Sequence, residues 1–352
     1  VIGSASSYVS APVHSPADGV VVDVRKVRVP SGAVADAIVI KCDETQSEGF
    51  TEEFAWQSES PEALLETVKS LGIVGMGGAT FPTAVKLTIP MGKKADALII
   101  NGVECEPYLT SDYRLMIERP DEILEGIMAA ARIISTDNII IGIEANKMDA
   151  VELLSSKIAA KGYPIKAQPL KMKYPQGDEK QLIKAILGRE VPSGKLPLDV
   201  GAVVCNVATS YAIYEAVKYH KPLIERVCTV SGEAVNEPKN VIAPIGTKFS
   251  DLIAYAGGAK DDLVSMIAGG PMMGFAVADP DTPMVKGSGG VLMLEKMIDD
   301  VSFPCVLCGK CVEHCPMGLM PNKMFRNIKY GNYKAAMDLG LMDCKECGCC
   351  AY

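Results

Sequence analysis

The sequence has few aromatic and histidine side chains and no long apolar run. Its 352 residues include a single Trp, Trp56, and three His. The longest strongly apolar stretches, 97–100 and 139–143, have the length of strands. A helix that spans a bilayer needs about 18 or more apolar residues. The sequence therefore predicts no membrane span, although the protein could bind at a membrane surface.

Clusters of basic residues are also missing. Lys and Arg number 35 against 43 Asp and Glu, which gives a formal net charge of −8. Nucleic-acid binding is not expected, because it depends on concentrated positive charge. Hydrophobic residues make up 48% and charged residues 22% of the chain, a balance typical of globular proteins and not of disordered ones. At about 150 residues per domain, the length predicts two or three domains.

The two ends of the sequence look like the limits of a fragment. It begins at Val1 without Met, and the first residues have neither the basic start nor the apolar stretch of a signal peptide. It stops at Tyr352, inside a cysteine motif. Of the 12 Cys, eight follow residue 300. Disulfides would suit a small secreted chain, so metal-bound thiolates in a reducing compartment are the better prediction.

Hydrophobic periodicity divides the chain into regions of different character. Residues 1–45 contain β-branched runs separated by turn signals, and residues 46–60 are polar and predict a linker or a crossing strand. From 60 to 225, predicted helices alternate with short apolar strands, which favours a parallel sheet with ligands at the carboxyl ends of its strands. Residues 226–285 predict a small mixed α+β unit, and residues 300–352 predict short helices between cysteines.

Two runs of cysteine dominate the last 50 residues. The first follows the spacing C-x2-C-x2-C-x3-C-P of bacterial two-cluster ferredoxins, and the second repeats its beginning. The fourth Cys of such a run serves the other cluster. The ligands predicted for one 4Fe-4S cluster are Cys315, Cys344, Cys347 and Cys350. Those predicted for the other are Cys305, Cys308, Cys311 and a Cys beyond residue 352. Zinc is the alternative, but this repeated spacing does not match a zinc pattern. Cys349 is out of register and is predicted to be a spare buried thiol.

A glycine-rich segment, GIVGMGGATFPTAVK at 72–86, is the second strong motif. It differs from the G-x-G-x-x-G fingerprint, but Gly75, Gly77 and Gly78 would let backbone N–H groups approach an anion closely. Lys86 could add a cation beside a phosphate or the edge of a flavin ring. The alternative is a plain glycine turn before a helix.

Carboxylates and amides gather in two further segments. NGVECEP, at 101–107, directly follows a predicted buried strand, the place where α/β proteins put ligand contacts. YPQGDE, at 174–179, has the same polar character. For both segments the alternative is a solvated loop without function.

Together these motifs resemble the RnfC family, the NADH-handling subunits of the Rnf electron-transport complex, a ferredoxin:NAD oxidoreductase. The resemblance rests on the glycine-rich segment, both cysteine runs, and segments spread from end to end: SAPVHSP (10–16), NGVECEPYLTSDYRLM (101–116), KYPQGDEKQLI (173–183), GREVPSGKLPLDVG (188–201), SGEAVNEPKN (231–240) and GGPMMG (269–274). The chain is more distantly similar to the NADH- and FMN-binding flavoprotein subunit of respiratory complex I.

The resemblance implies a multidomain α/β and α+β fold. Residues 1–45 would be part of a barrel-sandwich hybrid domain, and residues 46–225 an α/β domain that binds FMN and NADH. Residues 226–285 would be a β-grasp-type (SLBB) domain. Residues 286–352 would be a truncated ferredoxin-like domain with two 4Fe-4S clusters.

The resemblance also implies roles for single residues. FMN would be held by Gly75, Gly77, Gly78, Lys86, Asn101, Tyr174, Gly177, Asp178, Asn206 and Thr209. Nicotinamide-side contacts would be Phe81, Glu104, Glu106 and Glu179. Val103 and Met76 stand where the complex I relative has Asp and Arg, which bears more on the nicotinamide pose than on the flavin. Hydride transfer requires no acid–base side chain, so no catalytic residue is assigned.

These parts predict an oxidoreductase subunit. A flavin belongs between a nicotinamide, which exchanges two electrons as hydride, and clusters that pass one electron at a time. By resemblance, electrons from ferredoxin would arrive through other Rnf subunits and leave to NAD, at the cytoplasmic face of a bacterial or archaeal membrane. Those other subunits would translocate Na⁺ or H⁺. The alternatives are a soluble reductase of the same superfamily, such as a microcompartment cobalamin reductase, and a relay protein without flavin.

Overall fold

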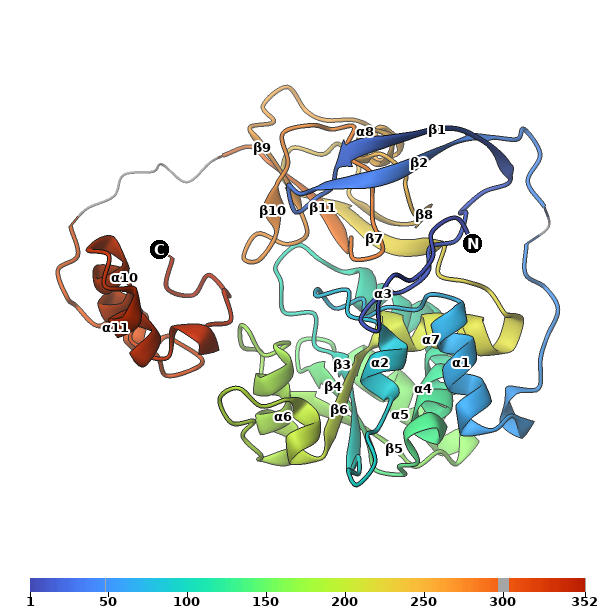
Figure 1. Ribbon diagram of the computed structural model, residues 1–352, viewed down its shortest axis with the longest axis horizontal. Helices are drawn as coiled ribbons and strands as arrows, with labels where there is room; N and C mark the ends of the chain where they lie inside the picture. Colours follow the sequence, from blue (N-terminus) through green and yellow to red (C-terminus); the bar gives the residue numbers. More distant parts are fainter. Residues whose placement is uncertain (48, 297–303, 352) are drawn as a thin grey trace.

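A computed structural model describes residues 1–47, 49–296 and 304–351, and these fold into several units (Figure 1). An N-terminal hairpin lies above a second, mixed sheet. A four-stranded sheet with its helices lies below. A group of short helices near the C-terminus lies to one side, next to α6 (Figure 1). None of the described helices is long and apolar enough to cross a membrane.

The four-stranded sheet is the centre of the α/β unit. Its strands are all parallel, in the order β5-β4-β3-β6. They are β3 (Ala97–Gly102), β4 (Ile139–Glu144), β5 (Ile165–Leu170) and β6 (Ala202–Asn206). β4 and β6 are buried along their whole length, because helices cover both faces of a parallel sheet and favour continuous apolar runs over alternation. The predicted α/β layer is thereby confirmed.

Seven helices belong to this unit. They are α1 (Pro61–Ser70), α2 (Thr83–Leu87), α3 (Ser111–Glu118), α4 (Pro120–Ile134), α5 (Met148–Lys161), α6 (Glu179–Leu187) and α7 (Val207–Tyr219). α1 begins as its sequence predicts: the Ser60 side chain accepts from the N–H of Ala63, and Pro61 takes the first helical position. α4 packs so closely on α7 that a side chain at Gly126 would overlap the carbonyl oxygen of Ser210.

The strand order creates a switch point beside β3. From β3 the chain proceeds outward to β4 and β5, and then returns to place β6 on the other side of β3. In open α/β sheets the ligand crevice lies at such a point, beyond the carboxyl ends of the two diverging strands. The last paired residues of β3 and β6 are Asn101 and Asn206, which lie directly opposite each other.

The mixed sheet has the order β10-β9-β11-β7-β8. Its strands are β7 (Glu225–Ser231), β8 (Lys239–Pro244), β9 (Ser265–Ala268), β10 (Phe275–Ala276) and β11 (Gly290–Leu294), and α8 (Phe249–Tyr255) accompanies them. β11 pairs in parallel with β7 and antiparallel with β9. This unit therefore includes a strand that lies beyond the boundary at residue 285 suggested by the sequence.

The N-terminal region is a hairpin of β1 (Gly19–Arg28) and β2 (Val34–Cys42), with an irregularity between Val21 and Asp23. Most of its side chains are exposed. The polar segment that follows forms no strand within its described part. Its one regular element is η1 (Trp56–Ser58), and Trp56 is buried in the core of the α/β unit.

The C-terminal region consists of short helices. They are α9 (Lys310–Glu313), α10 (Pro321–Lys329), α11 (Tyr333–Asp338) and η3 (Leu341–Asp343). The first cysteine run begins before α9 and ends between α9 and α10, and the second run follows η3. We refer to residues 304–351 as the cysteine module.

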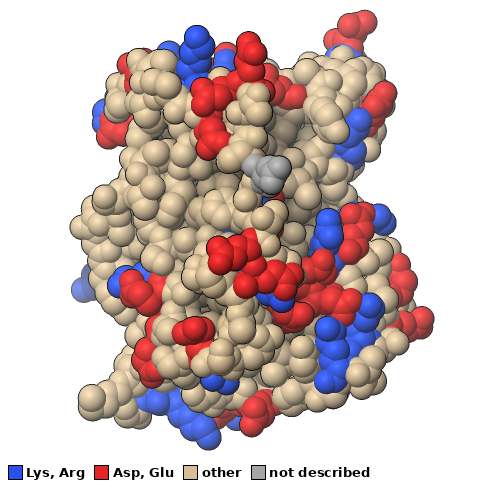
Figure 2. Space-filling view, turned by 90° about the vertical axis from the view of Figure 1, so that its right-hand side faces the viewer, with Lys and Arg blue, Asp and Glu red and all other residues tan. Residues whose placement is uncertain are grey.

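Charge is distributed unevenly over the surface. Asp and Glu side chains gather across the middle of the face shown in Figure 2, with Lys and Arg scattered or in small groups beside them. The excess of acidic side chains on this face is consistent with the formal net charge of −8. It shows no continuous basic surface of the kind that binds nucleic acid.

Candidate functional site

Two asparagines define the centre of the site. Asn206 ends β6 and caps α7, because its Oδ1 accepts from the N–H of Ala208 at 2.8 Å. Its Nδ2 donates to Asp112 at 2.6 Å. Asn101, opposite on β3, donates from Nδ2 to the carbonyl of Gly177 at 2.9 Å. The two predicted amides are therefore brought together at the switch point.

The glycine-rich loop lies against this pair. The N–H of Met76 donates to Thr209 Oγ1 at 3.0 Å, and the N–H of Gly75 donates to the carbonyl of Phe81 at 2.7 Å, which closes the loop. A Cβ on Gly77 would lie 3.3 Å from Cβ of Asn206. At Gly78 the space is open, but φ is +134°, which side chains rarely adopt. The backbone therefore comes close to Asn206 at Gly77, and the backbone conformation at Gly78 favours glycine.

The segment 174–179 forms the next side of the site. Gly177 lies under the Asn101 amide, and a Cβ on it would lie 3.1 Å from Sγ of Cys105. Asp178 caps α6 by accepting from the N–H groups of Lys180 and Gln181, both at 3.1 Å. The hydroxyl of Tyr174 donates to the carbonyl of Cys347 at 2.7 Å. The polar groups of this segment therefore bind Asn101, the start of α6 and the cysteine module.

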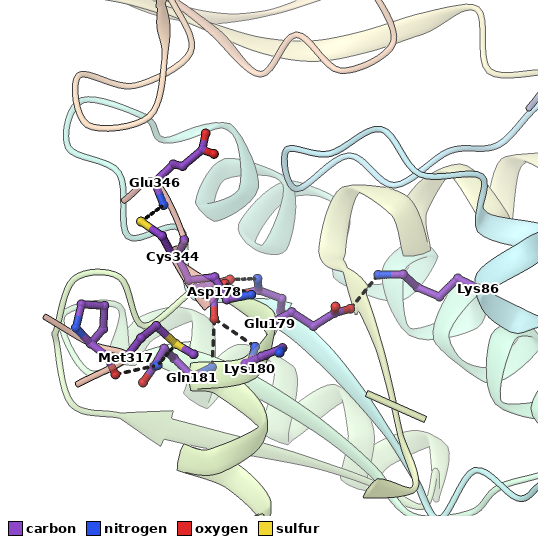
Figure 3. A network of polar contacts seen from close by, with 12 residues as sticks. Lys86, Asp178, Glu179, Lys180, Gln181, Met317, Cys344 and Glu346 are labelled. Carbon is purple, nitrogen blue, oxygen red and sulfur yellow. Dashed lines mark hydrogen bonds and ion pairs between the residues drawn. The ribbon is translucent and has the colours of Figure 1, made fainter. Parts of the chain in front are cut away.

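Lys86 and Glu179 join the glycine-rich segment to α6 (Figure 3). The Lys86 ammonium lies 2.8 Å from the Glu179 carboxylate, and both side chains are about one third exposed, 31% and 36%. An ion pair with this exposure contributes little to folding. Both groups remain accessible to a ligand.

Glu104 and Glu106 have structural partners. The Glu104 carboxylate accepts from the N–H groups of Asp112 and Tyr113, at 2.8 and 3.0 Å, at the start of α3. Burial, and then the nearby Asp112, raise the pKa of Glu104 to about 7. The Glu106 carboxylate accepts from the N–H groups of Met272 and Met273, and burial raises its pKa. Their predicted role beside the nicotinamide stays a prediction.

A buried layer of charge behind the glycine loop was not predicted from the sequence. Arg226, on β7, is 4% exposed and donates to the carbonyls of Lys286 and Met76, at 2.7 and 3.4 Å. Asp112 is its nearby counter-charge, although burial still raises the Asp112 pKa. No sequence signal marked these two residues, since each lies among other polar residues in its own element.

A cavity adjoins the outer side of the glycine loop. Its volume is about 340 Å³, within the range of small-molecule sites. It is lined by Val9, Ser10, Ala11, Val74, Ala79, Thr80, Phe81, Pro82 and Lys286. Burial lowers the pKa of Lys286 to about 8. A smaller cavity beside Met76 and Arg226, of about 20 Å³, has room for little more than a water molecule.

The predicted cysteine ligands differ in exposure. Cys305, Cys308, Cys344 and Cys350 are exposed, Cys311 and Cys315 are half-buried, and Cys347 is buried. Burial, followed by the thiols of Cys344, Cys347 and Cys315, raises the pKa of Cys350. Burial and Cys347 raise the pKa of Cys349 to about 11. Over the described ranges, no group of three or more His, Cys, Asp or Glu residues is arranged to hold a metal ion.

Three family models match the chain. The RnfC barrel sandwich hybrid domain matches residues 1–45, the Nuo51 FMN-binding domain matches residues 68–215, and the SLBB domain matches residues 227–276. These matches agree with the mixed α/β fold class. They place the Asn101–Asn206 pair and the glycine-rich loop inside a region related to FMN-binding domains.

Curated relatives are similar along most of the chain, and each is the subunit designated C of its complex. The one from the proton-translocating ferredoxin:NAD(+) oxidoreductase complex of Clostridium ljungdahlii is 45% identical over 92% of this chain and 71% of its own length. A Na(+)-translocating counterpart from Acetobacterium woodii is 40% identical over 91% of this chain and 73% of its own length. A counterpart from the ion-translocating oxidoreductase complex of Rhodobacter capsulatus is 41% identical over 97% and 67%.

A solved structure shares the fold. An NAD+-reducing [NiFe]-hydrogenase in the air-oxidized state matches with a TM-score of 0.59 and 22% identity, over 68% of this chain and 47% of the matched chain. At this identity the likeness concerns the fold alone.

Proposed function

Because this chain belongs to the RnfC family of ion-translocating ferredoxin:NAD(+) oxidoreductase complexes, we propose that it is the subunit that exchanges electrons with NAD(H). FMN would be bound in its α/β unit, and two 4Fe-4S clusters in its cysteine module. Its partners would be the other subunits of the complex, with ferredoxin as an indirect donor. It would lie at the cytoplasmic face of a membrane, and other subunits would move the ion.

The observation that carries this proposal is the convergence at the switch point. Asn101 and Asn206 lie opposite each other at the strand ends. The glycine loop is so close to Asn206 that a Cβ on Gly77 would lie 3.3 Å from it. The carbonyl of Gly177 accepts from the Asn101 amide. This combination of amides with a backbone that only glycine fits suits a planar, hydrogen-bonding group with a phosphate. The chain's residues therefore fit FMN.

The residues divide the work of binding between them. Backbone N–H groups of Gly77 and Gly78 would face the phosphate, with the Lys86 ammonium as the nearby cation. Asn101 and Asn206 would orient the ring through their amides, and Thr209 holds the loop in place through Met76. When bound, FMN supplies the change from two-electron hydride transfer to one-electron transfer.

The nicotinamide nucleotide would approach from the exposed side. Phe81 is 38% exposed, and a ring in that position can stack on a flat ligand. Glu179 presents a partly exposed carboxylate that can accept hydrogen bonds from a ribose or an amide. Glu104 and Glu106 would act on this side mainly by holding α3 and the 269–274 loop in place.

The cysteine module would supply the one-electron centres. The thiols predicted for one cluster are Cys315, Cys344, Cys347 and Cys350, and the first three contribute to the raised pKa of Cys350. Backbone N–H groups point at two of these sulfurs: Leu319 N lies 3.4 Å from Cys315 Sγ, and Glu346 N lies 3.4 Å from Cys344 Sγ. Such donors stabilise a negatively charged cluster and tune its potential.

The test is to purify the full-length protein anaerobically. It should release stoichiometric flavin on heating and reduce an artificial one-electron acceptor with NADH. It should also contain about eight iron atoms, the number in two 4Fe-4S clusters. Protein that holds its full iron but no flavin would support the relay alternative. Stoichiometric zinc, without broad absorption near 400 nm, would contradict the cluster assignment.

A further inference from the structure

One short segment of the α/β unit contacts both candidate redox sites. Residues 174–181, which we call the bridging segment, include the loop before α6 and the first residues of that helix. Figure 3 shows the polar network of this segment, which runs from Lys86 through Glu179 and Asp178 to the cysteine module.

On the cysteine side, the bridging segment makes three polar contacts. The hydroxyl of Tyr174 donates to the carbonyl of Cys347 at 2.7 Å. The side-chain amide of Gln181 donates to the carbonyl of Pro316 at 3.0 Å. The Lys345 ammonium lies 3.6 Å from Asp178. Two of the contacted residues, Lys345 and Cys347, lie inside the second cysteine run, and Pro316 directly follows Cys315.

On the flavin side, the same residues or their immediate neighbours contact the predicted FMN shell. Gly177 accepts from the Asn101 amide at 2.9 Å, and Glu179 pairs with Lys86 at 2.8 Å. No more than three residues separate any cysteine-side contact from a flavin-side contact along the segment. Movement of the cysteine module on this segment would therefore be transmitted directly to the flavin shell.

The 269–274 loop closes the junction from the mixed sheet. Its Met272 donates from N–H to Glu106 at 3.0 Å. The carbonyl oxygen of Met272 lies 3.0 Å from the position that a Cβ on Gly348 would take. Gly348 lies between Cys347 and Cys350, so the second cysteine run is held between two units of the protein. Exposure of the thiols does not separate the runs, since Cys305, Cys308, Cys344 and Cys350 are all exposed. The contrast lies in the contacts, which involve Cys347, Gly348 and the residue after Cys315.

We propose that the bridging segment fixes the order of the redox centres: the cluster held by Cys315, Cys344, Cys347 and Cys350 is the neighbour of the flavin, and the cluster of the first run faces outward to the donor. Gln181 and Lys345 are positioning residues for this arrangement. The inference rests on the proposed function, since it requires FMN and the clusters to be bound.

The order has a chemical consequence. With FMN and the clusters bound, NADH would give up two electrons as hydride, and these would pass on one at a time through the cluster nearest the flavin. Loosening the bridging segment should therefore slow the one-electron step without affecting hydride transfer.

The experiment uses anaerobically purified full-length protein with the variants Gln181→Leu and Lys345→Met and their combination. Rapid mixing with NADH should bleach the flavin at the wild-type rate, while bleaching of the clusters slows several-fold in the combined variant. Hydrogen–deuterium exchange should accelerate in residues 344–351. The control is Lys184→Leu, which also places Leu on α6 but removes an ion pair with Glu190.

Unchanged cluster bleaching and unchanged exchange in the combined variant would overturn the inference. If that variant lost flavin, Gln181→Leu alone would decide. Its side-chain amide binds Pro316 and Met317 and no predicted flavin residue among those described. If the wild-type protein contained no flavin, the proposed function would be contradicted instead. Hydrogen–deuterium exchange in residues 344–351 would still test whether the bridging segment holds the cysteine module in place.

Discussion

Single residues in the glycine loop differ in why they must be glycine. Gly77 lies so close to Asn206 that a Cβ would press on it at 3.3 Å. Gly78 has open space around it but a φ of +134°. The first position is limited by contact and the second by backbone conformation. The two can be separated by mutation.

Gly78→Val should release FMN while the cysteine module keeps its iron, because the branched side chain cannot adopt the loop's backbone conformation. Flavin fluorescence after heat release and iron in the same sample measure both. Gly92→Val is the matched control, since Gly92 also has positive φ, +82°, with open space around it. Stoichiometric flavin in Gly78→Val would show that the loop is only a turn.

Glu179→Gln should weaken NADH oxidation and leave flavin bound. The substitution keeps the shape of the side chain but removes the charge that pairs with Lys86. We expect KM for NADH to rise several-fold, measured with an artificial acceptor alongside the flavin content. Glu190→Gln, at an exposed ion pair after α6, is the control. Parallel loss of flavin and activity would place Glu179 in the flavin shell instead.

Glu104 should give the protein a pH-dependent stability. Its pKa rises from 4.5 to about 7 on folding, so the folded protein keeps a proton that the unfolded chain has released. Stability from this group is complete below pH 4.5 and falls as the pH rises towards 7, by at most about 1.4 kcal/mol per unit. Denaturant unfolding of Glu104→Gln across this window should show a flatter profile than wild type.

Glu66→Gln, on α1 and 66% exposed, is the control for that experiment and should keep the wild-type slope. An identical slope in Glu104→Gln and wild type would mean that the buried carboxyl is ionised throughout. Many other carboxylates titrate in the same range, and the comparison between variants removes their common contribution.

At the scale of elements, the sequence predicted what local periodicity determines. The apolar runs at 97–100 and 139–143, predicted to have the length of strands, lie in β3 and β4. β5 escaped prediction, because Ile165–Leu170 contains Lys, Gln and Pro and lies at the sheet edge, where only one neighbour is needed. The pairing of Asn101 with Asn206 depends on strand order, which periodicity does not specify.

The site shows the same division. Its motif residues could be named from the sequence because each carries a polar or glycine signature of its own, and their roles stay predictions. Asp112 and Arg226 were not, since their role arises from burial beside each other across two units. Gln181 was missed for a related reason: its partners lie 135 and 136 residues away.

The cysteine runs can be tested as elements. Cys315→Ala should remove most of the iron held by the second run and leave that of the first, so the iron content should fall by about half. Cys205→Ala, at a buried thiol of β6, is the control and should keep full iron. Complete retention of iron in Cys315→Ala would contradict the exchange of the fourth ligand between runs.

At the scale of the whole molecule, Arg226 connects the mixed sheet to the α/β unit. Its guanidinium binds carbonyls from the glycine loop and from the segment before β11, and lies near the buried Asp112. Breaking a buried pair by removing one partner leaves the other charge without compensation. The two units should therefore depend on this side chain together.

Arg226→Met should destabilise the protein by about 3–5 kcal/mol, the usual cost of an uncompensated buried charge. Denaturant unfolding, followed by Trp56 fluorescence and by circular dichroism, measures the effect on the α/β unit and on the whole. Arg25→Met, on the exposed strand β1, is the control and should change the free energy of unfolding by no more than about 0.5 kcal/mol. A small effect of Arg226→Met would show that water replaces the guanidinium.

The Lys286 ammonium binds the carbonyls of Pro12 and Gly72, at 2.8 and 2.6 Å, and so ties together three distant parts of the chain. During synthesis, Pro12 leaves the ribosome 274 residues before its partner. At about 5–20 residues per second, that delay is roughly 14–55 s. The wall of the cavity beside the glycine loop is therefore completed late, and a nascent chain that ends before Lys286 cannot yet form it.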